Sequence, residues 1–469
     1  MDARGLAVPS PGALANLASR LGPGQLSERV ETLERYARDE STRLCSVPRA
    51  VVRPETAEGV SEVLRWASEG GFAVVPRGAG TGVAGGAVAV GGEVVLSLER
   101  LDRVLEVDDE NFTLTCEPGV ITEKVHQAAE ARGLFYPPDP ASLSSCSIGG
   151  NVAVGAGGAR AVKYGTTRDY LLGAQVVLAN GTVVEWGGKN VKDASGYHLL
   201  ALLVGSEGTL GVVTRVTLRL IPLPTRRVVL LAAFPELEGA ARAVTRLMQQ
   251  RIVPSVAEFM DDVAVAAARR YLCRSLPGGD RAGAFALVEL DGNDAGVLEA
   301  EMVRVDELAR SEGALDVVAA EDAGQQARLW ESRRCIADAL RAISPEIGKA
   351  DVAVPRARVP ELVKDIKSVG LRHGLTAACF GHAGDGNVHV NLLRETLEEN
   401  EWSARLSAAM SDVMDVTRRL GGVPSGEHGI GVLKKPYLTR FLAPETLELM
   451  RRVKDAFDPR GILNPGKVF

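Results

Sequence analysis

Two short histidine-containing segments carry the side chains best suited to metal chemistry. The first reads Cys379-Phe-Gly-His-Ala-Gly-Asp-Gly-Asn-Val-His-Val-Asn391, and the second reads Ser425-Gly-Glu-His-Gly-Ile-Gly431. Three of the chain's six histidines fall in these segments. Neutral imidazole combined with carboxylate is a ligand set that suits Zn²⁺, Mn²⁺ or Fe²⁺. The alternative is that these are ordinary loop histidines beside glycines.

The first segment predicts a β-hairpin that brings its two histidines together. If Asp385-Gly386 is a two-residue turn, His382 lies directly opposite His389 on the neighbouring strand. Such partners have Cβ atoms roughly 4.5–5.5 Å apart, close enough for two imidazoles to bind one ion. Asn391 points to the same face as His389, because it follows two residues later.

Two histidines leave a metal site incomplete, so we expect a carboxylate from elsewhere in the chain. Glu427 is that candidate, because it is flanked by glycine and stands beside His428. We assign His428 as the candidate general base, since imidazole exchanges protons near neutral pH. A purely structural role for His428 is the competing interpretation.

A glycine-rich loop from Pro76 to Ala87 offers a different chemistry. It reads Pro-Arg-Gly-Ala-Gly-Thr-Gly-Val-Ala-Gly-Gly-Ala after an apolar strand, so successive backbone N–H groups can converge on a pyrophosphate. It contains Gly-x-Gly-x-x-Gly, the fingerprint of nicotinamide-dinucleotide folds, but that fingerprint requires a helix to begin inside it. Here the next element is a predicted strand, 93–98. A glycine-rich turn without a ligand is the alternative.

The elements before this loop predict the start of a βαβ unit. A strand at 50–53 precedes a helix that Thr56 caps and that closes at Gly70-Gly71. An amphipathic helix is expected at 26–37, and a hairpin at 175–185 with Asn180-Gly181 as its turn. Two further glycine clusters, 148–158 and 205–214, suggest an extended ligand gripped at several points.

Length and composition limit the possible classes of protein. A chain of 469 residues is long enough for two domains. Its net charge of −6 argues against a nucleic-acid partner, and no apolar run approaches the ~18 residues of a membrane span. The N-terminus shows no signal-peptide pattern. The six cysteines include no Cys-x-x-Cys pair, which favours a reducing compartment and argues against an iron–sulfur cluster of the usual spacing.

Three motifs, in this order and spacing, carry a family resemblance. They are Pro-Arg-Gly-Ala-Gly-Thr-Gly at 76–82, Ile-Gly-Gly-Asn-Val-Ala-x-x-Ala-Gly-Gly at 148–158 and Gly-Ser-Glu-Gly-Thr-Leu-Gly-Val-Val-Thr at 205–214. From about Cys45 to its end, the chain resembles the vanillyl-alcohol oxidase superfamily with its PCMH-type FAD-binding domain. Within it, the chain is similar to the FAD-linked subunit of bacterial glycolate oxidase and to the D-lactate and D-2-hydroxyglutarate dehydrogenases.

The resemblance implies an α+β fold in four parts. These are an N-terminal helical segment (1–44), a PCMH-type FAD-binding domain (45–224), a substrate or cap domain (225–425) and a C-terminal segment returning to the FAD domain (426–469). In the cap domain, strands alternating with long helices predict an antiparallel sheet with helices on one face.

The resemblance also implies which residues bind FAD. The first loop would hold the pyrophosphate, the second would line the flavin and ribityl side, and the third would lie near the ribose and adenine. Those residues are Pro76, Arg77, Gly78, Ala79, Gly80, Thr81, Gly82, Gly149, Gly150, Asn151, Gly157, Gly158, Gly208, Val212 and Val213. Asn464 is expected to approach the ring, with a turn role as the alternative. Because no histidine lies between Pro76 and Ala87, we expect non-covalent FAD.

The activity implied is oxidation of a D-2-hydroxy acid, such as glycolate or D-lactate, by hydride transfer to flavin N5. By resemblance, Arg333 and Lys349 bind the substrate carboxylate, although the adjacent Arg334 is an alternative and either cation could be a surface charge. The 2-hydroxyglutarate enzymes have a threonine one turn after this arginine, and Ala337 stands there here, which favours a smaller monocarboxylate.

Three functional hypotheses follow. The first is a metal-assisted dehydrogenase that passes electrons to an iron–sulfur partner subunit, a quinone or an electron-transfer protein. The second is a flavin-binding subunit without catalysis, and the third is an oxidase of another alcohol class that uses O₂. The dehydrogenase is favoured because His382, His389 and Glu427 are all present. We expect a cytoplasmic protein, either free or held at the inner membrane by a partner, as a homodimer or a hetero-oligomer.

Overall fold

The computed structural model describes residues 5–41, 44–344 and 346–469, so residues 1–4 and 42–43 of the expected N-terminal segment lie outside it. The chain divides into two compact units. The first unit comprises 1–156, 166–223 and 427–469, and the second comprises 157–165 and 224–426.

The first unit contains a small sheet built around a parallel βαβ arrangement. Its strands lie in the order β1 (Leu26–Ser27), β2 (Ala50–Val52), β4 (Val94–Ser97) and β3 (Val74–Arg77), and the last three are parallel. The connecting helix is α3 (Ala57–Gly70). Thr56 caps it by accepting a hydrogen bond from the Gly59 N–H at 3.1 Å, and Gly71 ends it in the left-handed conformation, as predicted.

One of two local predictions for this unit differs from the structure. The helix expected over 26–37 is instead strand β1 followed by the short helix α2 (Val30–Arg35). Leu26 and Ser27 pair with β2, so sheet formation prevails over the helical pattern. The glycine loop after β3 joins strand to strand with no helix, as expected.

A second sheet of the first unit is antiparallel. Its order is β5 (Val104–Asp108), β6 (Thr113–Cys116), β10 (Val212–Arg219), β8 (Leu171–Val177) and β9 (Val183–Gly187). The remaining elements of this unit are α1 (Pro11–Arg20), α4 (Thr122–Glu130), β7 (Leu134–Phe135), α5 (Ile148–Val154), α7 (Thr167–Tyr170), α8 (Leu199–Leu203), β11 (Ile221–Pro222), α16 (Lys435–Phe441) and α17 (Pro444–Phe457). One apolar core joins α1, α3 and both sheets, and Ile462 and Leu463 from the end of the chain complete it.

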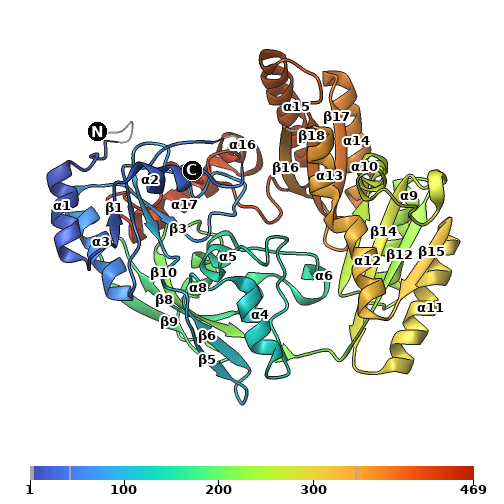
Figure 1. The fold of residues 1–469 in the computed structure, drawn as a ribbon, viewed down its shortest axis with the longest axis horizontal. Helices are drawn as coiled ribbons and strands as arrows, with labels where there is room; N and C mark the ends of the chain where they lie inside the picture. Colours follow the sequence, from blue (N-terminus) through green and yellow to red (C-terminus); the bar gives the residue numbers. More distant parts are fainter. Residues whose placement is uncertain (1–4, 42–43, 345) are drawn as a thin grey trace. The chain divides into compact units, whose positions relative to one another are not determined.

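The second unit is built on one antiparallel sheet of seven strands (Figure 1). Their order is β15 (Asp316–Ala320), β12 (Arg226–Phe234), β14 (Ala284–Gly292), β13 (Val256–Met260), β17 (Thr376–His382), β18 (Asn387–Leu393) and β16 (Ile347–Ala353). Its helices are α6 (Ala161–Tyr164), α9 (Leu237–Gln249), α10 (Asp262–Leu272), α11 (Ala295–Ser311), α12 (Ala323–Arg334), α13 (Ile336–Ile343), α14 (Val359–His373) and α15 (Glu399–Arg419), with short 3₁₀ turns at Gly279–Arg281 and Arg356–Arg358.

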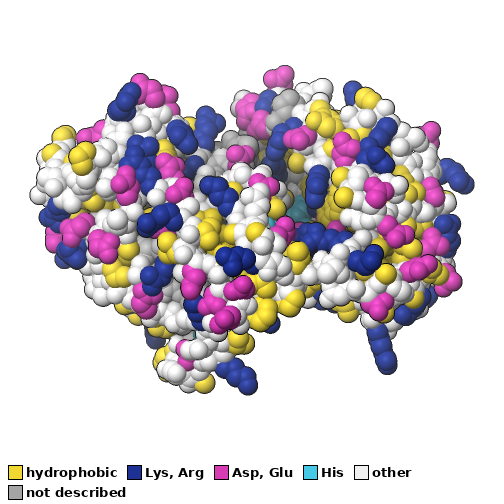
Figure 2. All heavy atoms as spheres, turned by 60° about the horizontal axis from the view of Figure 1, so that its bottom comes forward, with side chains coloured by type: hydrophobic (Ala, Val, Ile, Leu, Met, Phe, Trp, Pro, Cys, Tyr) yellow, Lys and Arg dark blue, Asp and Glu magenta, His cyan; other side chains and the backbone are white. Residues whose placement is uncertain are grey.

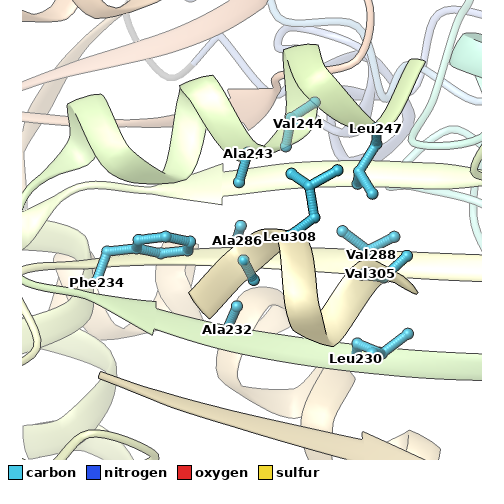
Figure 3. Close-up of a pocket in the computed structure, with 11 residues that line it drawn as sticks. Leu230, Ala232, Phe234, Ala243, Val244, Leu247, Ala286, Val288, Val305 and Leu308 are labelled. Atoms are coloured by element: carbon cyan, nitrogen blue, oxygen red, sulfur yellow. The ribbon is translucent and has the colours of Figure 1, made fainter. Parts of the chain in front are cut away.

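Helices cover both faces of this sheet, which corrects the expectation of one covered face. On one face, α9 and α11 enclose a pocket lined only by apolar side chains, including Leu230 of β12 and Val288 of β14 (Figure 3). On the other face, α10, α12 and α13 pack over Leu231 and Leu287. Strands β12 and β14 carry runs of buried, mainly apolar residues that point alternately to the two faces of the sheet, so both faces must be covered. We call the face under α10, α12 and α13 the site face.

The surface in view in Figure 2 mixes basic and acidic side chains, with neither sign gathered into one large patch. This agrees with the small net charge of −6. Among the described residues, no helix has the length and apolar character needed to cross a membrane.

Candidate active site

The three glycine-rich segments of the first unit meet beside the end of β3. The Ala79 N–H donates to Ser147 Oγ at 3.1 Å, directly before α5. A Cβ on Gly78 would stand 2.4 Å from that same oxygen, and one on Gly208 would stand 3.2 Å from the Pro76 ring. Segments far apart in sequence therefore form one cradle, and glycine is needed where they touch. This is an arrangement in which backbone N–H groups fit a pyrophosphate.

The Arg77 side chain makes its contacts with the protein around the first loop. Its Nη1 donates to the Ala87 carbonyl at 3.2 Å, and its guanidinium lies 5.4 Å from the centre of the Tyr36 ring. Gly80, at φ +78°, leaves room for it, because a Cβ there would lie 2.1 Å from Nη2. Burial lowers the pKa of Arg77. These contacts indicate that Arg77 braces the loop that Gly80, Thr81 and Gly82 continue.

The second glycine cluster forms a helix where the sequence suggested a loop. Helix α5 begins at Ile148 and contains Gly149 and Gly150, while a left-handed Gly155 ends it. Gly149 lies against Pro118, where a Cβ would be 2.9 Å from the Pro118 carbonyl oxygen. Asn151 is buried and donates to Thr122 Oγ1 at 2.7 Å, so its side chain holds α5 against α4.

The remaining predicted FAD residues lie in different places. Gly157 and Gly158 belong to the second unit and precede α6. Val212 and Val213 are buried at the start of β10. Asn464 is 1% exposed, and its Nδ2 donates to the carbonyl oxygens of Gly86 and Glu207 at 3.0 and 2.7 Å. The observed contacts of the Asn464 side chain are therefore with backbone carbonyls of distant segments.

Glu207 anchors the segment that follows the second histidine motif. Its carboxylate accepts hydrogen bonds from the N–H groups of Ile430 and Gly431, at 2.7 and 2.8 Å. Burial raises its pKa, although these two donors act in the opposite direction. Just upstream, His428 Nε2 lies 3.6 Å from Glu427 Oε1. The first unit therefore holds Glu427 and His428 on a fixed stretch of backbone.

In the second unit, the register of the hairpin differs from the prediction. His382 pairs with Asn387, and His389 pairs with Phe380. The turn spans four residues, 383–386, and the N–H groups of Asp385 and Gly386 both donate to the His382 carbonyl, at 3.3 and 3.0 Å. The two-residue turn is therefore wrong. Because the shift is by two residues, both histidines still point to one face.

The two imidazoles are neighbours on the site face. Their ring centres are 5.2 Å apart and their planes are nearly perpendicular, at 85°. Asn391 lies on the same face and pairs in register with Lys349 of β16. Four of the side chains predicted from the sequence are thus brought together by adjacent strands β17, β18 and β16.

A buried glutamate that the sequence analysis did not single out joins this group. Glu258 of β13 pairs in register with His382 and is 1% exposed. One carboxylate oxygen contacts His382 Nδ1, and the other accepts from Arg333 Nε at 2.6 Å. Burial by itself raises the pKa of Glu258, but His382 and Arg333 outweigh it and hold that pKa below its usual value. The acidic residue within the otherwise apolar sequence 256–260 could have revealed Glu258, because a buried acid needs a partner.

Asp351 is a second buried carboxylate that the sequence analysis missed. It pairs in register with His389, and its Oδ1 lies 3.6 Å from His389 Nδ1. It accepts from Asn387 Nδ2 at 2.7 Å, and its other oxygen accepts from Ser425 Oγ and the Gly426 N–H, at 3.2 and 3.1 Å. Strand alternation places it on the same face as Lys349, two residues earlier, and this could have revealed it.

The two arginine candidates are neighbours on α12 but contact different surroundings. Arg333 faces the sheet, where it pairs with Glu258 and its guanidinium lies 4.7 Å from the centre of the Phe380 ring. Arg334 is exposed and lies over the Trp330 ring at 5.0 Å. The geometry therefore favours Arg333. Lys349 is exposed on β16.

The side chains of the site face fit a divalent metal ion. Asp351 and His389 offer ligand atoms within 4.8 Å of each other, and so do Glu427 and His428 in the first unit. Metal-binding histidines commonly have their second ring nitrogen fixed by a carboxylate, which is the arrangement that Glu258 makes with His382. The second unit thus contributes two donors, Asp351 and His389, to a candidate His/Asp/Glu metal site.

Comparison with known families identifies the class of protein as a flavin-dependent oxidoreductase. The family model of the FAD binding domain matches residues 48–187, and that of the C-terminal domain of FAD linked oxidases matches residues 223–468. The chain belongs to this family of FAD-linked oxidases.

Curated relatives span nearly the whole chain. Glycolate oxidase subunit GlcD of Bacillus subtilis is 39% identical, covering 92% of each chain, and D-lactate dehydrogenase of Archaeoglobus fulgidus is 40% identical, covering 95% of this chain and 98% of its own. A solved structure of p-cresol methylhydroxylase with substrate bound superposes with a TM-score of 0.82 at 18% identity, over 99% of this chain and 98% of that one. The last likeness confirms the predicted PCMH-type fold.

Proposed function

We propose that this protein oxidises a D-2-hydroxy acid to the 2-oxo acid, with FAD as hydride acceptor and a divalent metal ion bound at the site face. The observation that carries the proposal is the meeting of metal-binding and carboxylate-binding side chains on one face of the second unit's sheet. His382, His389 and Asp351 supply metal-type donors there. Arg333 and Lys349 supply cations.

The residues of the second unit divide the work of holding the substrate. Arg333 binds the substrate carboxylate through its Nη groups, since its Nε is used by Glu258. Lys349 adds a second positive charge, and Asn391, opposite it in the sheet, offers an amide for the hydroxyl or carboxylate oxygen. Together these contacts orient Cα for hydride removal.

His382 and His389 hold the metal ion, with Glu427 as the third ligand. Support for Glu427 comes from its neighbours in the chain. Ser425 and Gly426 donate hydrogen bonds to Asp351, which pairs in register with His389. Glu427 is the next residue after Gly426. A bound divalent ion, Zn²⁺, Mn²⁺ or Fe²⁺, supplies Lewis-acid polarisation of the substrate hydroxyl. His428, beside Glu427, takes the hydroxyl proton as general base.

Three glycine-rich segments hold the cofactor, and the second of them ends in Gly157 and Gly158 of the second unit. Gly78 to Gly82 receive the pyrophosphate, the segment from Gly149 to Gly158 lines the flavin, and Gly208 to Val213 lie along the ribose and adenine. Bound FAD supplies a hydride acceptor at N5. The missing histidine between Pro76 and Ala87 supports non-covalent attachment.

The relatives suggest the substrate class and the route of the electrons. They are named for glycolate, D-lactate and, at 32% identity in Stutzerimonas stutzeri, D-2-hydroxyglutarate. Ala337, which has no hydroxyl for a second carboxylate, favours a small monocarboxylate. One relative is named as a subunit of glycolate oxidase, so electrons would pass to an iron–sulfur partner subunit, a quinone or an electron-transfer protein.

The test is anaerobic bleaching of the flavin in the purified protein, compared between metal-loaded and chelator-treated samples. The substrates are glycolate, D-lactate, L-lactate and D-2-hydroxyglutarate. We expect a D-acid or glycolate to bleach the flavin and chelation to abolish it. Bound FAD that no hydroxy acid reduces would overturn the proposal and support a flavin-binding subunit without catalysis.

Matched variants assign the roles. Arg333→Ala is expected to raise the substrate KM at least tenfold, whereas Arg334→Ala, on the same helix but over Trp330, leaves it unchanged. His389→Ala is expected to lose metal-dependent bleaching. His373→Ala, which removes a histidine paired with Asp412 between α14 and α15, retains it.

A further inference from the structure

Glu258 touches two side chains that the proposed function uses for different purposes. One oxygen of its carboxylate contacts the Nδ1 atom of His382, the candidate metal ligand. The other accepts from Nε of Arg333, the candidate carboxylate-binding residue, at 2.6 Å. Three elements far apart in sequence, β13, β17 and α12, therefore meet at one carboxyl group.

Glu258 and its two partners are largely shielded from solvent. Its side chain is 1% exposed, and those of Arg333 and His382 are only 14% and 9% exposed. A buried carboxylate is costly unless it is paired and hydrogen-bonded, and both oxygens of Glu258 are engaged. Its backbone is fixed as well, because β13 lies between β14 and β17 in the sheet.

The contacts determine what each partner can do. With Nδ1 directed at Glu258, His382 has Nε2 as the ring nitrogen on the opposite edge, so the tautomer and ring orientation suit a metal ligand. Arg333 donates through Nε to Glu258, and its guanidinium lies over the Phe380 ring. The two Nη groups are the remaining N–H donors of the guanidinium.

We propose that Glu258 is a positioning residue that aligns His382 for metal binding and Arg333 for substrate-carboxylate binding, so that one buried carboxylate couples the two halves of the site. This inference rests on the proposed function. It adds that a change at Glu258 alters metal affinity and carboxylate affinity together, although Glu258 itself binds neither.

Glu258→Gln is the informative substitution because glutamine has one acceptor and one donor. If its amide oxygen accepts from Arg333, its NH₂ group faces His382 Nδ1 and favours the tautomer with the proton on Nε2, which removes that nitrogen as a metal ligand. If its amide oxygen accepts from His382, its NH₂ group faces the N–H donor of Arg333. Glu258→Asp keeps the charge, but it is one methylene too short to reach both partners, and it serves as the second variant if Glu258→Gln folds poorly.

The matched control is Glu289→Gln. Glu289 is also a buried glutamate of the same sheet, at 4% exposure on the neighbouring strand β14. It accepts from Trp330 Nε1 at 3.1 Å and from Ser255 Oγ, and its contacts include neither His382 nor Arg333. The control therefore removes a buried negative charge from the same sheet without touching the proposed coupling.

The first readout is Zn²⁺ affinity of the full-length FAD-containing protein, measured by competition with a chelator and independent of turnover. We expect Glu258→Gln and Glu258→Asp to bind Zn²⁺ about 10–100-fold more weakly than the wild type, and Glu289→Gln to match the wild type. In a His382→Ala background, Glu258→Gln should change Zn²⁺ affinity less than twofold, because Glu258 acts through His382.

The second readout is binding of pyruvate to the oxidised, metal-free protein after the chelator is removed, followed by the flavin difference spectrum. We expect at least a fivefold weaker dissociation constant in Glu258→Gln and no change in Glu289→Gln. Wild-type Zn²⁺ and pyruvate affinities in Glu258→Gln would overturn the coupling and leave the proposed function standing. A wild-type protein that binds no Zn²⁺, Mn²⁺ or Fe²⁺ would overturn both.

Discussion

At the scale of single residues, several buried polar side chains act by holding the backbone of distant segments. Asn464 is in the left-handed region, at φ 42°, and its amide donates to the carbonyl oxygens of Gly86 and Glu207. The sequence suggested contact with the flavin ring for this residue. Its observed partners explain why an amide donor is needed at this position.

Asn464→Asp is therefore expected to destabilise the protein by about 2–4 kcal/mol, because it removes two donors and sets a carboxylate against two buried carbonyl oxygens. Urea unfolding measures the effect. The control is Asn293→Asp, since Asn293 Oδ1 accepts from the Thr225 N–H at 3.1 Å and an aspartate still accepts there. Equal stabilities of the two variants would contradict this account.

Asp261 leads to a prediction about pH. It is buried and accepts from the N–H groups of Ala264 and Cys379, and Lys367 Nζ lies 3.1 Å away. Burial raises its pKa from 3.8 to about 6, against the effect of these partners. The folded state then binds this proton more tightly than the unfolded state, so stability contributed by the protonated group is lost as pH rises between those two values.

We expect the stability of the wild type relative to Asp261→Asn to fall by on the order of 2 kcal/mol between about pH 4 and pH 7. Urea unfolding of both proteins at each pH measures this difference, and the comparison cancels other titrating groups. A difference that stays constant, or that grows with pH, would contradict the raised pKa.

At the scale of elements, the β17–β18 hairpin determines where both histidines point. Its four-residue turn depends on Gly386, which has φ +88° and whose added Cβ would stand 2.0 Å from the Val354 carbonyl oxygen. A larger residue at this position forces the turn away from β16, and His382, Asn387 and His389 move with it.

Gly386→Ala should therefore abolish high-affinity Zn²⁺ binding and lower stability by more than about 2 kcal/mol, since it adds a backbone clash to the cost of a positive φ. Gly421→Ala is the control, because Gly421 has φ +76° and open space around its Cβ position. That variant should lose only about 1 kcal/mol and keep the metal site. Chelator competition and urea unfolding distinguish the two, and a Gly386→Ala protein with normal Zn²⁺ affinity would show that the turn does not position the histidines.

At the scale of the whole molecule, the cysteines bear on how electrons would leave a bound flavin. Its six cysteines are all unpaired in the part of the chain that the structure describes, and four of them are buried. Their spacing does not suit an iron–sulfur cluster. On the proposed function, we therefore expect the flavin to pass its electrons directly to an external acceptor.

We expect steady-state turnover with an artificial dye acceptor to exceed turnover with O₂ at least tenfold. Stopped-flow reoxidation of substrate-reduced protein by each acceptor measures this directly, and its rate should not depend on treatment with a thiol-blocking reagent. Faster reoxidation by air than by the dye would instead indicate an oxidase.

The sequence by itself determined a large part of this protein. The three glycine motifs identified the FAD-binding fold, because a phosphate cradle requires residues without side chains at closely spaced positions. Thr56 and Gly71 marked the ends of α3, since capping depends on neighbours only a few residues away. Strand alternation placed His389 and Asn391 on one face without knowledge of their partners.

Tertiary structure alone decided the register of the hairpin, the covering of both sheet faces and the partners of the site residues. Glu258 meets His382 across 124 residues of chain, and Arg333 across 75. No local pattern encodes such a pairing, because it depends on which strands become neighbours and on the helix that packs above them. The sequence could name the candidate histidines, but only the folded sheet showed which buried carboxylates contact them.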